Sequence, residues 1–167
     1  MPIYTEIMSD SQILHLIPTQ CHNIFLIGCG ACTNESLAYR NDLPIYKECI
    51  GAPYPYATSI ELSRIKKLLQ KNGFFVECKY FDDISGFLCM NHLGQNDYSL
   101  EWNELPDIIL CMCCSSGYAA IKKAIPTILV ETVSQIKGVI SYSYKDIGNT
   151  RIIVKEQSVV VPIKDGD

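Results

Sequence analysis

The sequence predicts an α/β protein of Rossmann-like type, with a mostly parallel sheet, helices on both faces of that sheet and a C-terminal antiparallel β appendage. Apolar runs such as "NIFLIG" and "DIILCMC" are continuous rather than alternating, which is typical of strands buried on both faces. Amphipathic segments separate these runs, and strands that alternate with helices favour parallel pairing through right-handed crossovers. Near the C-terminus, short apolar segments between turn signals indicate antiparallel strands.

The first half of the chain contains two short predicted helices and a buried strand, followed by a long loop and then a third, longer helix. Residues 8–17 are predicted to form a helix and residues 23–28 a strand, and a second, short helix follows "GCGAC". Residues 44–57 contain three prolines and predict a long loop, a feature that is commonly functional. Thr58 or Ser59 then caps a clearly amphipathic helix.

The second half continues the alternation of strands and helices. Residues 74–81 and 107–113 are predicted strands, and the segment 82–106 between them is polar and irregular. A helix over 115–125 and a strand over 127–131 complete the α/β pattern, because Pro126 ends the helix.

The chain is long enough for one core, and its composition is that of a folded protein. It has 167 residues, of which 48% are hydrophobic and 19% are charged. We expect one α/β domain that binds a cysteine cluster over residues 1–138, and a β-strand appendage over 139–167 packed on the same domain.

Charge and hydropathy exclude two classes of partner. The net charge is −4 and no basic tract occurs, so we expect no nucleic acid partner. Apolar runs stay far below the roughly 18 residues that span a bilayer, so we expect no membrane partner. The N-terminal segment has no signal-peptide pattern, which predicts a cytoplasmic protein. The pattern leaves a homo-oligomer open.

Nine cysteines are the most informative feature of the sequence. Cys29 and Cys32 follow the first predicted parallel strand, Cys89 lies in the loop after the second, and Cys113 and Cys114 close the third. In a parallel α/β sheet the carboxyl ends of the strands share one edge, where ligands bind. Because disulfides are rare in a reducing cytosol, cysteines that gather at such an edge predict metal binding or redox chemistry.

The spacing indicates which group such a site would hold. Cys29 and Cys32 form a C-x-x-C pair, and four thiolates suit either tetrahedral zinc or an iron–sulfur cluster. The remaining ligands come singly from distant loops, which favours a cluster and leaves zinc open. Gly28 and Gly30 would let the backbone approach the cofactor, so that its N–H groups could bond to cluster sulfurs.

The stretch "DIILCMCCSSG" is expected to offer one ligand. Strand alternation places Cys111 and Cys113 on one face, where Cys111 is buried in the sheet. Cys114 sits at the turn into the next helix, whose N-terminus favours a thiolate. We therefore predict Cys114 as the ligand and Cys113 as its alternate.

Other interpretations explain less of the pattern. A dinucleotide fingerprint at "GCGACT" lacks its third glycine, because Thr33 holds that place. A thioredoxin-like C-x-x-C pair would leave Cys89 and Cys114 unexplained. His92, a lone loop histidine, carries little signal as a ligand. The tyrosines of the Pro-rich segment would either form a partner-binding patch or pack on the sheet edge; they are Tyr46, Tyr54 and Tyr56.

The motifs "FLIGCGAC" and "PDIILCMCCSSGYAAIKKAIPTILV", with a single loop cysteine between them, resemble the C-terminal domain associated with methylenetetrahydrofolate reductase. That domain also occurs as a small separate subunit in anaerobic bacteria, and the resemblance covers about residues 9–138. Ser115 stands where the family usually has glycine. A β tail replaces the family's cysteine-rich extension.

The resemblance implies a small subunit that holds a 4Fe–4S cluster and partners a larger flavin-containing reductase or another redox protein. By this resemblance, four cysteines would be the cluster ligands: Cys29, Cys32, Cys89 and Cys114. Cys49, in the segment 33–57 that is expanded relative to the family, is a further alternate. We expect an electron-transfer or accessory subunit without catalytic residues of its own. A zinc-binding structural module is the alternative, and an enzyme whose cluster binds substrate directly is a third.

Overall fold

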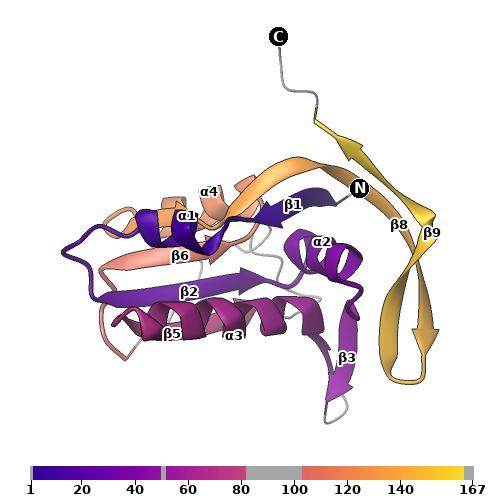
Figure 1. The fold of residues 1–167 in the computed structure, drawn as a ribbon, viewed down its shortest axis with the longest axis horizontal. Coiled ribbons are helices and arrows are strands. Elements are labelled where there is room, and N and C mark those ends of the chain that lie inside the picture. The colour runs from indigo at the N-terminus through magenta and orange to yellow at the C-terminus, as the bar shows by residue number, and fades with distance from the viewer. Residues whose placement is uncertain (1, 50–51, 82–102, 164–167) are drawn as a thin grey trace.

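The structure is a computed structural model and describes residues 2–49, 52–81 and 103–163 (Figure 1). In chain order its elements are β1 (Ile3–Ile7), α1 (Asp10–His15), β2 (Asn23–Cys29), α2 (Cys32–Asn41), β3 (Tyr46–Cys49), β4 (Ala52–Pro55), α3 (Tyr56–Lys71), β5 (Phe75–Phe81), β6 (Ile108–Met112), α4 (Ser115–Ala124), β7 (Leu129–Thr132), β8 (Ser134–Ile147) and β9 (Thr150–Pro162).

The strands form two sheets, and this corrects the predicted fold class. A parallel sheet has the order β5-β2-β6-β7, and a larger, antiparallel sheet has the order β1-β8-β9-β3-β4. The prediction of a mostly parallel sheet with a C-terminal appendage is therefore wrong. The second sheet takes strands from the start, the middle and the end of the chain.

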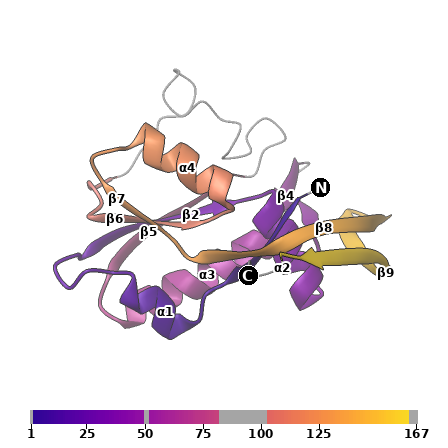
Figure 2. The ribbon, with the colours of Figure 1, turned by 90° about the horizontal axis from the view of Figure 1, so that it is seen from above.

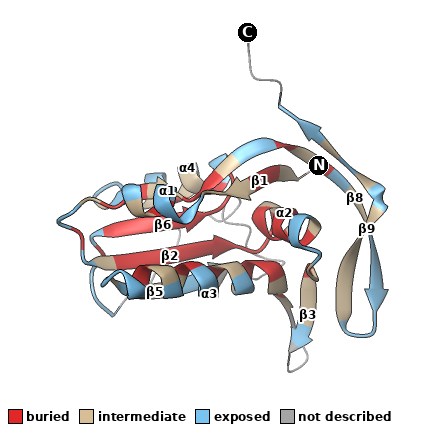
Figure 3. Ribbon diagram, in the orientation of Figure 1, coloured by how far each residue is buried: buried red, intermediate tan, exposed pale blue. Residues whose placement is uncertain are grey.

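The parallel sheet follows from the continuous apolar runs. Every residue of β6 is buried, and six of the seven residues of β2 are buried. Figure 2 shows α4 on one face of this sheet and α1 with α3 on the other, and Figure 3 shows the buried strands between them. Each face carries its own apolar cluster, so the main core of the protein lies around this sheet.

The antiparallel sheet was only partly predictable. Residues 44–57 were expected to be a loop, but they contain β3 and β4, which pair with each other, and β3 also pairs with β9. The N-terminal strand β1 was not predicted, and it pairs with β8. The expected domain boundary at 138/139 falls inside β8. These pairings join segments far apart in sequence, which local patterns do not reveal.

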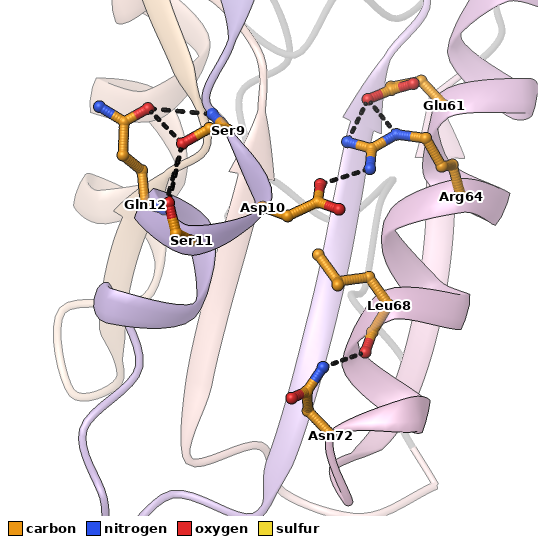
Figure 4. A network of polar contacts seen from close by, with 8 residues as sticks. All are labelled: Ser9, Asp10, Ser11, Gln12, Glu61, Arg64, Leu68 and Asn72. Carbon is orange, nitrogen blue, oxygen red and sulfur yellow. Dashed lines mark hydrogen bonds and ion pairs between the residues drawn. The ribbon is translucent and has the colours of Figure 1, made fainter.

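The helix starts follow local capping chemistry in some cases and tertiary packing in others. Ser9 caps α1 through a capping box with Gln12 (Figure 4). α3 begins at Tyr56 with Pro55 as its N-cap, so the expected cap at Thr58 or Ser59 is wrong. Among the helices of the described residues, none combines the length and apolar character that a membrane crossing requires.

Candidate thiolate site

Two of the predicted cysteine-bearing loops meet at one edge of the parallel sheet, and the strand before the third ends there too. In the registers of the sheet, Cys29 pairs with Phe81 at the end of β5, and Gly28 pairs with Met112 at the end of β6. The ends of β2, β5 and β6 therefore lie side by side. The loops after β2 and β6 place Cys32 and Cys114 in contact with each other at this edge.

Two of the candidate ligands are not placed at this edge. Cys89 lies outside the described residues, as does the histidine His92, and the segment that carries both follows Phe81. Cys49 ends β3 in the antiparallel sheet, and its side chain is not described.

Cys32 and Cys114 form a thiol–thiolate pair at the N-termini of two helices. Cys32 is the first residue of α2, and Cys114 is the N-cap of α4. The S–H group of Cys32 donates a hydrogen bond to the sulfur of Cys114. This bond and burial raise the pKa of Cys32, so Cys32 keeps its proton.

Cys114 carries the negative charge of the pair. The hydrogen bond from Cys32 lowers the pKa of Cys114 to about 5, against the opposing effect of burial. The backbone N–H groups of Gly117 and Ser116 at the start of α4 lower this pKa further. The side chain of Cys114 nevertheless forms no capping hydrogen bond to the helix. Since the thiolate is the nucleophile and the metal ligand, Cys114 is prepared for either role at neutral pH.

The other cysteines of this edge lie deeper in the protein. Cys29, Cys111 and Cys113 are at most 3% exposed and belong to the apolar cluster on the α4 side of the sheet. A hydrogen bond with Cys111, together with burial, raises the pKa of Cys113 well above its usual value. Cys111 is therefore buried in the sheet as predicted, and the alternate ligand Cys113 is a protonated core thiol.

The loop from Cys29 to Cys32 is fixed through its carbonyl groups. Thr58 Oγ1 on α3 donates to the Cys29 carbonyl at 3.0 Å, and the Tyr46 hydroxyl on β3 donates to the Gly30 carbonyl at 3.0 Å. Ser36 Oγ donates to the Cys32 carbonyl at 2.7 Å. Side chains from three different elements therefore hold the C-x-x-C segment.

The two glycines of this segment have different surroundings. A Cβ atom on Gly28 would lie 2.6 Å from Leu62 Cδ1 and 2.7 Å from Thr58 Cγ2 on α3. Gly28 therefore faces α3, and close helix–sheet packing accounts for it without a cofactor. Gly30, by contrast, lies between the two cysteines of the pair predicted to bind metal, and its carbonyl is bound by Tyr46.

A buried acid lies one helical turn from Cys32. Glu35 Oε1 accepts a hydrogen bond of 2.5 Å from the Tyr142 hydroxyl on β8, and Glu35 Oε2 is buried without a partner among the described residues. Burial raises the pKa of Glu35. Glu35 in turn contributes to the raised pKa of Cys32. The sequence analysis did not single out Glu35 or Tyr142, because their pairing joins positions 107 residues apart.

The predicted tyrosine patch separates into two parts. Tyr46 reaches the C-x-x-C segment, whereas Tyr54 and Tyr56 stack edge to face with their ring centroids 6.0 Å apart. The ammonium group of Lys47 lies 3.9 Å from the Tyr56 ring centroid. Tyr46 therefore contacts the C-x-x-C segment, whereas the other two tyrosines contact each other.

The described residues supply a reactive pair rather than a complete ligand set. Within the part of the chain that the structure describes, no three His, Cys, Asp or Glu side chains are arranged to hold a metal ion. What the geometry provides is one thiolate, one neighbouring thiol and two helix N-termini at one sheet edge. Such an arrangement can bind a soft metal or exchange disulfides.

Comparisons with protein families, curated proteins and solved structures find no match to this chain. The resemblance to the domain associated with methylenetetrahydrofolate reductase therefore stays a prediction from the motifs.

Proposed function

We propose that the protein is a small subunit of a cytoplasmic redox complex that holds a 4Fe–4S cluster at the carboxyl edge of its parallel sheet. The observation that carries this proposal is the thiol–thiolate pair of Cys32 and Cys114. The cluster would exchange single electrons with a larger partner, a flavin-containing reductase subunit or another redox protein.

The chemistry of the donors fits this group in part. The contact with Cys32 lowers the pKa of Cys114, so this sulfur gives up its proton to a metal more readily than an ordinary thiol does. The N–H groups at the start of α4 can also stabilise negative charge on the cluster. Cys29 lies at the end of the neighbouring strand β2, and we propose it with Cys89 as the remaining ligands.

Anaerobic reconstitution with ferrous iron and sulfide tests the proposal. The wild-type chain should become brown and contain about four irons and four sulfides, as the cluster type requires. Cys32→Ser and Cys114→Ser should abolish the cluster, whereas Cys78→Ser should not, because Cys78 is an exposed residue of β5. A colourless protein that retains about one zinc would support the structural zinc module instead.

A dithiol–disulfide centre is the second candidate, and the direct hydrogen bond between the two sulfurs favours it. Cys114 would attack a disulfide of a substrate, and one substrate sulfur would leave as a thiolate. Cys32, once deprotonated, would then attack the Cys114 sulfur and release the second substrate thiol, so that two electrons pass to the substrate. Equilibration with glutathione followed by mass spectrometry tests this function. A Cys32–Cys114 disulfide that forms and reverses would support it, and two persistent thiols would exclude it.

A further inference from the structure

The conformation of the Cys29–Cys32 loop is held by hydrogen bonds to its carbonyl groups. Each of its four successive carbonyl groups accepts a bond from outside the loop. The donors, in the order of the carbonyls, are Thr58 Oγ1 at 3.0 Å, the Tyr46 hydroxyl at 3.0 Å, the Glu35 backbone N–H at 3.0 Å and Ser36 Oγ at 2.7 Å. The direction in which the loop presents Cys32 is therefore set by its surroundings.

Tyr46 differs from the other three donors because it belongs to the antiparallel sheet. Its side chain comes from β3, whereas Thr58 lies on helix α3, and Glu35 and Ser36 lie on helix α2. Burial raises the pKa of Tyr46 to about 12, so its hydroxyl keeps its proton and remains a donor.

Tyr142 makes a second connection of the same kind. It lies on β8 of the antiparallel sheet, and its hydroxyl donates to Glu35 in the first turn of α2. Because residues three apart lie on the same face of a helix, this bond acts on the turn that carries Cys32. Two hydroxyl groups of one sheet thus reach the loop and the helix that present a cysteine at the edge of the other sheet.

We propose that Tyr46 and Tyr142 are positioning residues, through which the antiparallel sheet fixes the Cys29–Cys32 loop and the first turn of α2, and with them Cys32, at the edge of the parallel sheet. The inference rests on the proposed function in one respect, namely that this pair is the working centre. Loss of the Tyr46 hydroxyl leaves the Gly30 carbonyl without its donor, so the loop can turn and Cys32 can move away from Cys114. A loop that is free to turn also exposes the Cys32 side chain more to reagents in solution.

The test compares Tyr46→Phe and Tyr142→Phe with Tyr118→Phe. The control loses a similar bond, because the Tyr118 hydroxyl donates to the Val130 carbonyl at 3.2 Å and not to a carbonyl of the loop; this hydroxyl also accepts a bond from Lys122 at 3.0 Å. Reduced, metal-free protein is treated anaerobically with iodoacetamide. Peptide mass spectrometry then gives the alkylation rate of Cys32 relative to that of the exposed Cys78. Cobalt(II) titration gives the affinity of the thiolate pair for a soft metal, since cobalt–thiolate bonds absorb strongly.

Tyr46→Phe should raise the relative alkylation rate of Cys32 and weaken cobalt binding, each by about threefold to tenfold, which is the effect of losing one neutral hydrogen bond. Tyr142→Phe should act in the same direction, and Tyr118→Phe should change neither quantity. All three variants are checked for equal melting temperatures, because a purely structural role would move the melting temperature and leave the alkylation ratio unchanged.

The outcomes separate this inference from the proposed function. If the wild-type chain binds neither cobalt nor an iron–sulfur cluster, the proposed function fails, while the alkylation ratios still test the tyrosines. If Tyr46→Phe and Tyr142→Phe both match Tyr118→Phe in alkylation ratio and cobalt affinity, the positioning role is overturned, even in a chain that takes up a cluster.

Discussion

The two sheets of this protein differ in how deeply their residues are buried. Every residue of β6 in the parallel sheet is buried, whereas no residue of β9 in the antiparallel sheet is fully buried. Apolar clusters cover both faces of the parallel sheet, while β8 and β9 form a long hairpin that extends from the body in Figure 1. We infer that burial in the parallel sheet provides most of the stability, whereas the antiparallel sheet provides the tyrosine hydroxyl groups that reach the thiolate site.

The largest expected effect compares core residues of the two sheets. Leu110→Ala on β6 should lower the free energy of unfolding by about 2–5 kcal/mol, because Leu110 is fully buried and the change leaves a cavity. Val159→Ala on β9 should change it by less than about 0.5 kcal/mol, because Val159 is 59% exposed. Urea denaturation measures both values. Similar losses for the two variants would mean that the hairpin packs against something in solution.

A second comparison uses a glycine from each sheet. A Cβ atom on Gly138 of β8 would lie 2.2 Å from the Val161 carbonyl oxygen, and backbone atoms of a paired strand cannot move aside. On Gly28 of β2 it would meet only side-chain atoms of Leu62 and Thr58. Gly138→Ala should therefore break the pairing of β8 with β9 locally, and Gly28→Ala should cost about 1–3 kcal/mol by overpacking. Hydrogen exchange of β9 amides separates the two effects: Gly138→Ala should speed exchange there, and Gly28→Ala should not.

The same contrast explains how much of the fold the sequence predicts. The strands β2, β5, β6 and β7 and the helices between them follow from runs of neighbouring residues, so they were predicted to within a few residues. In the antiparallel sheet, the local sequence of β3 predicts a Pro-rich loop, but the segment forms a strand because it pairs with β4 and with β9. Local patterns carry no information about such distant partners.

The candidate site divides in the same way. Cys32 and Cys114 were predictable, because parallel strands bring their carboxyl ends to one edge. Their unequal pKa values depend on a hydrogen bond between loops 82 positions apart, which no spacing rule gives. The tyrosine contacts with Gly30 and Glu35 come from the antiparallel sheet. Because the strand order of that sheet was not predictable from the sequence, these contacts were not predictable either.

A pH titration of stability should distinguish a residue of the parallel sheet from one at the junction of the two sheets. Asp107 accepts bonds from the backbone N–H groups of Asn23 and His22, which lower its pKa. Its contribution is therefore present above the unfolded value of about 3.9 and is lost as the pH falls through the lower folded value. Asp107→Asn should remove this loss at acid pH.

Glu35 should show the opposite dependence. Burial raises its pKa, so the folded state is favoured below the unfolded value of about 4.3 and loses this advantage as the pH rises through the folded value. Glu35→Gln retains an acceptor for Tyr142 and should flatten the curve on that side. The urea midpoint from pH 3 to pH 8 measures both slopes. If the wild-type contributions of Asp107 and Glu35, each taken as the difference from its variant, changed with pH in the same direction, the opposite pKa shifts assigned to the two residues would be contradicted.

The smallest expected effect concerns two arginines that form ion pairs on the surface. Arg64 on α3 binds Asp10 of α1 at 2.5 Å and Glu61 at 2.8 Å, so it joins two helices of the parallel half (Figure 4). Arg40 on α2 binds Glu6 of β1 at 3.1 Å, so it joins the helix to the antiparallel sheet.

Both arginines are more than 40% exposed, so each substitution should cost at most about 1 kcal/mol at low salt. Arg64→Gln should cost more than Arg40→Gln, because Arg64 has two acidic partners. In 1 M salt both differences should nearly disappear, since charges are then screened over about 3 Å. If Arg40→Gln instead cost more and retained its cost in high salt, the antiparallel sheet would depend on that ion pair for its attachment. Tyr46 and Tyr142 would then lie on a sheet too weakly attached to fix the position of Cys32.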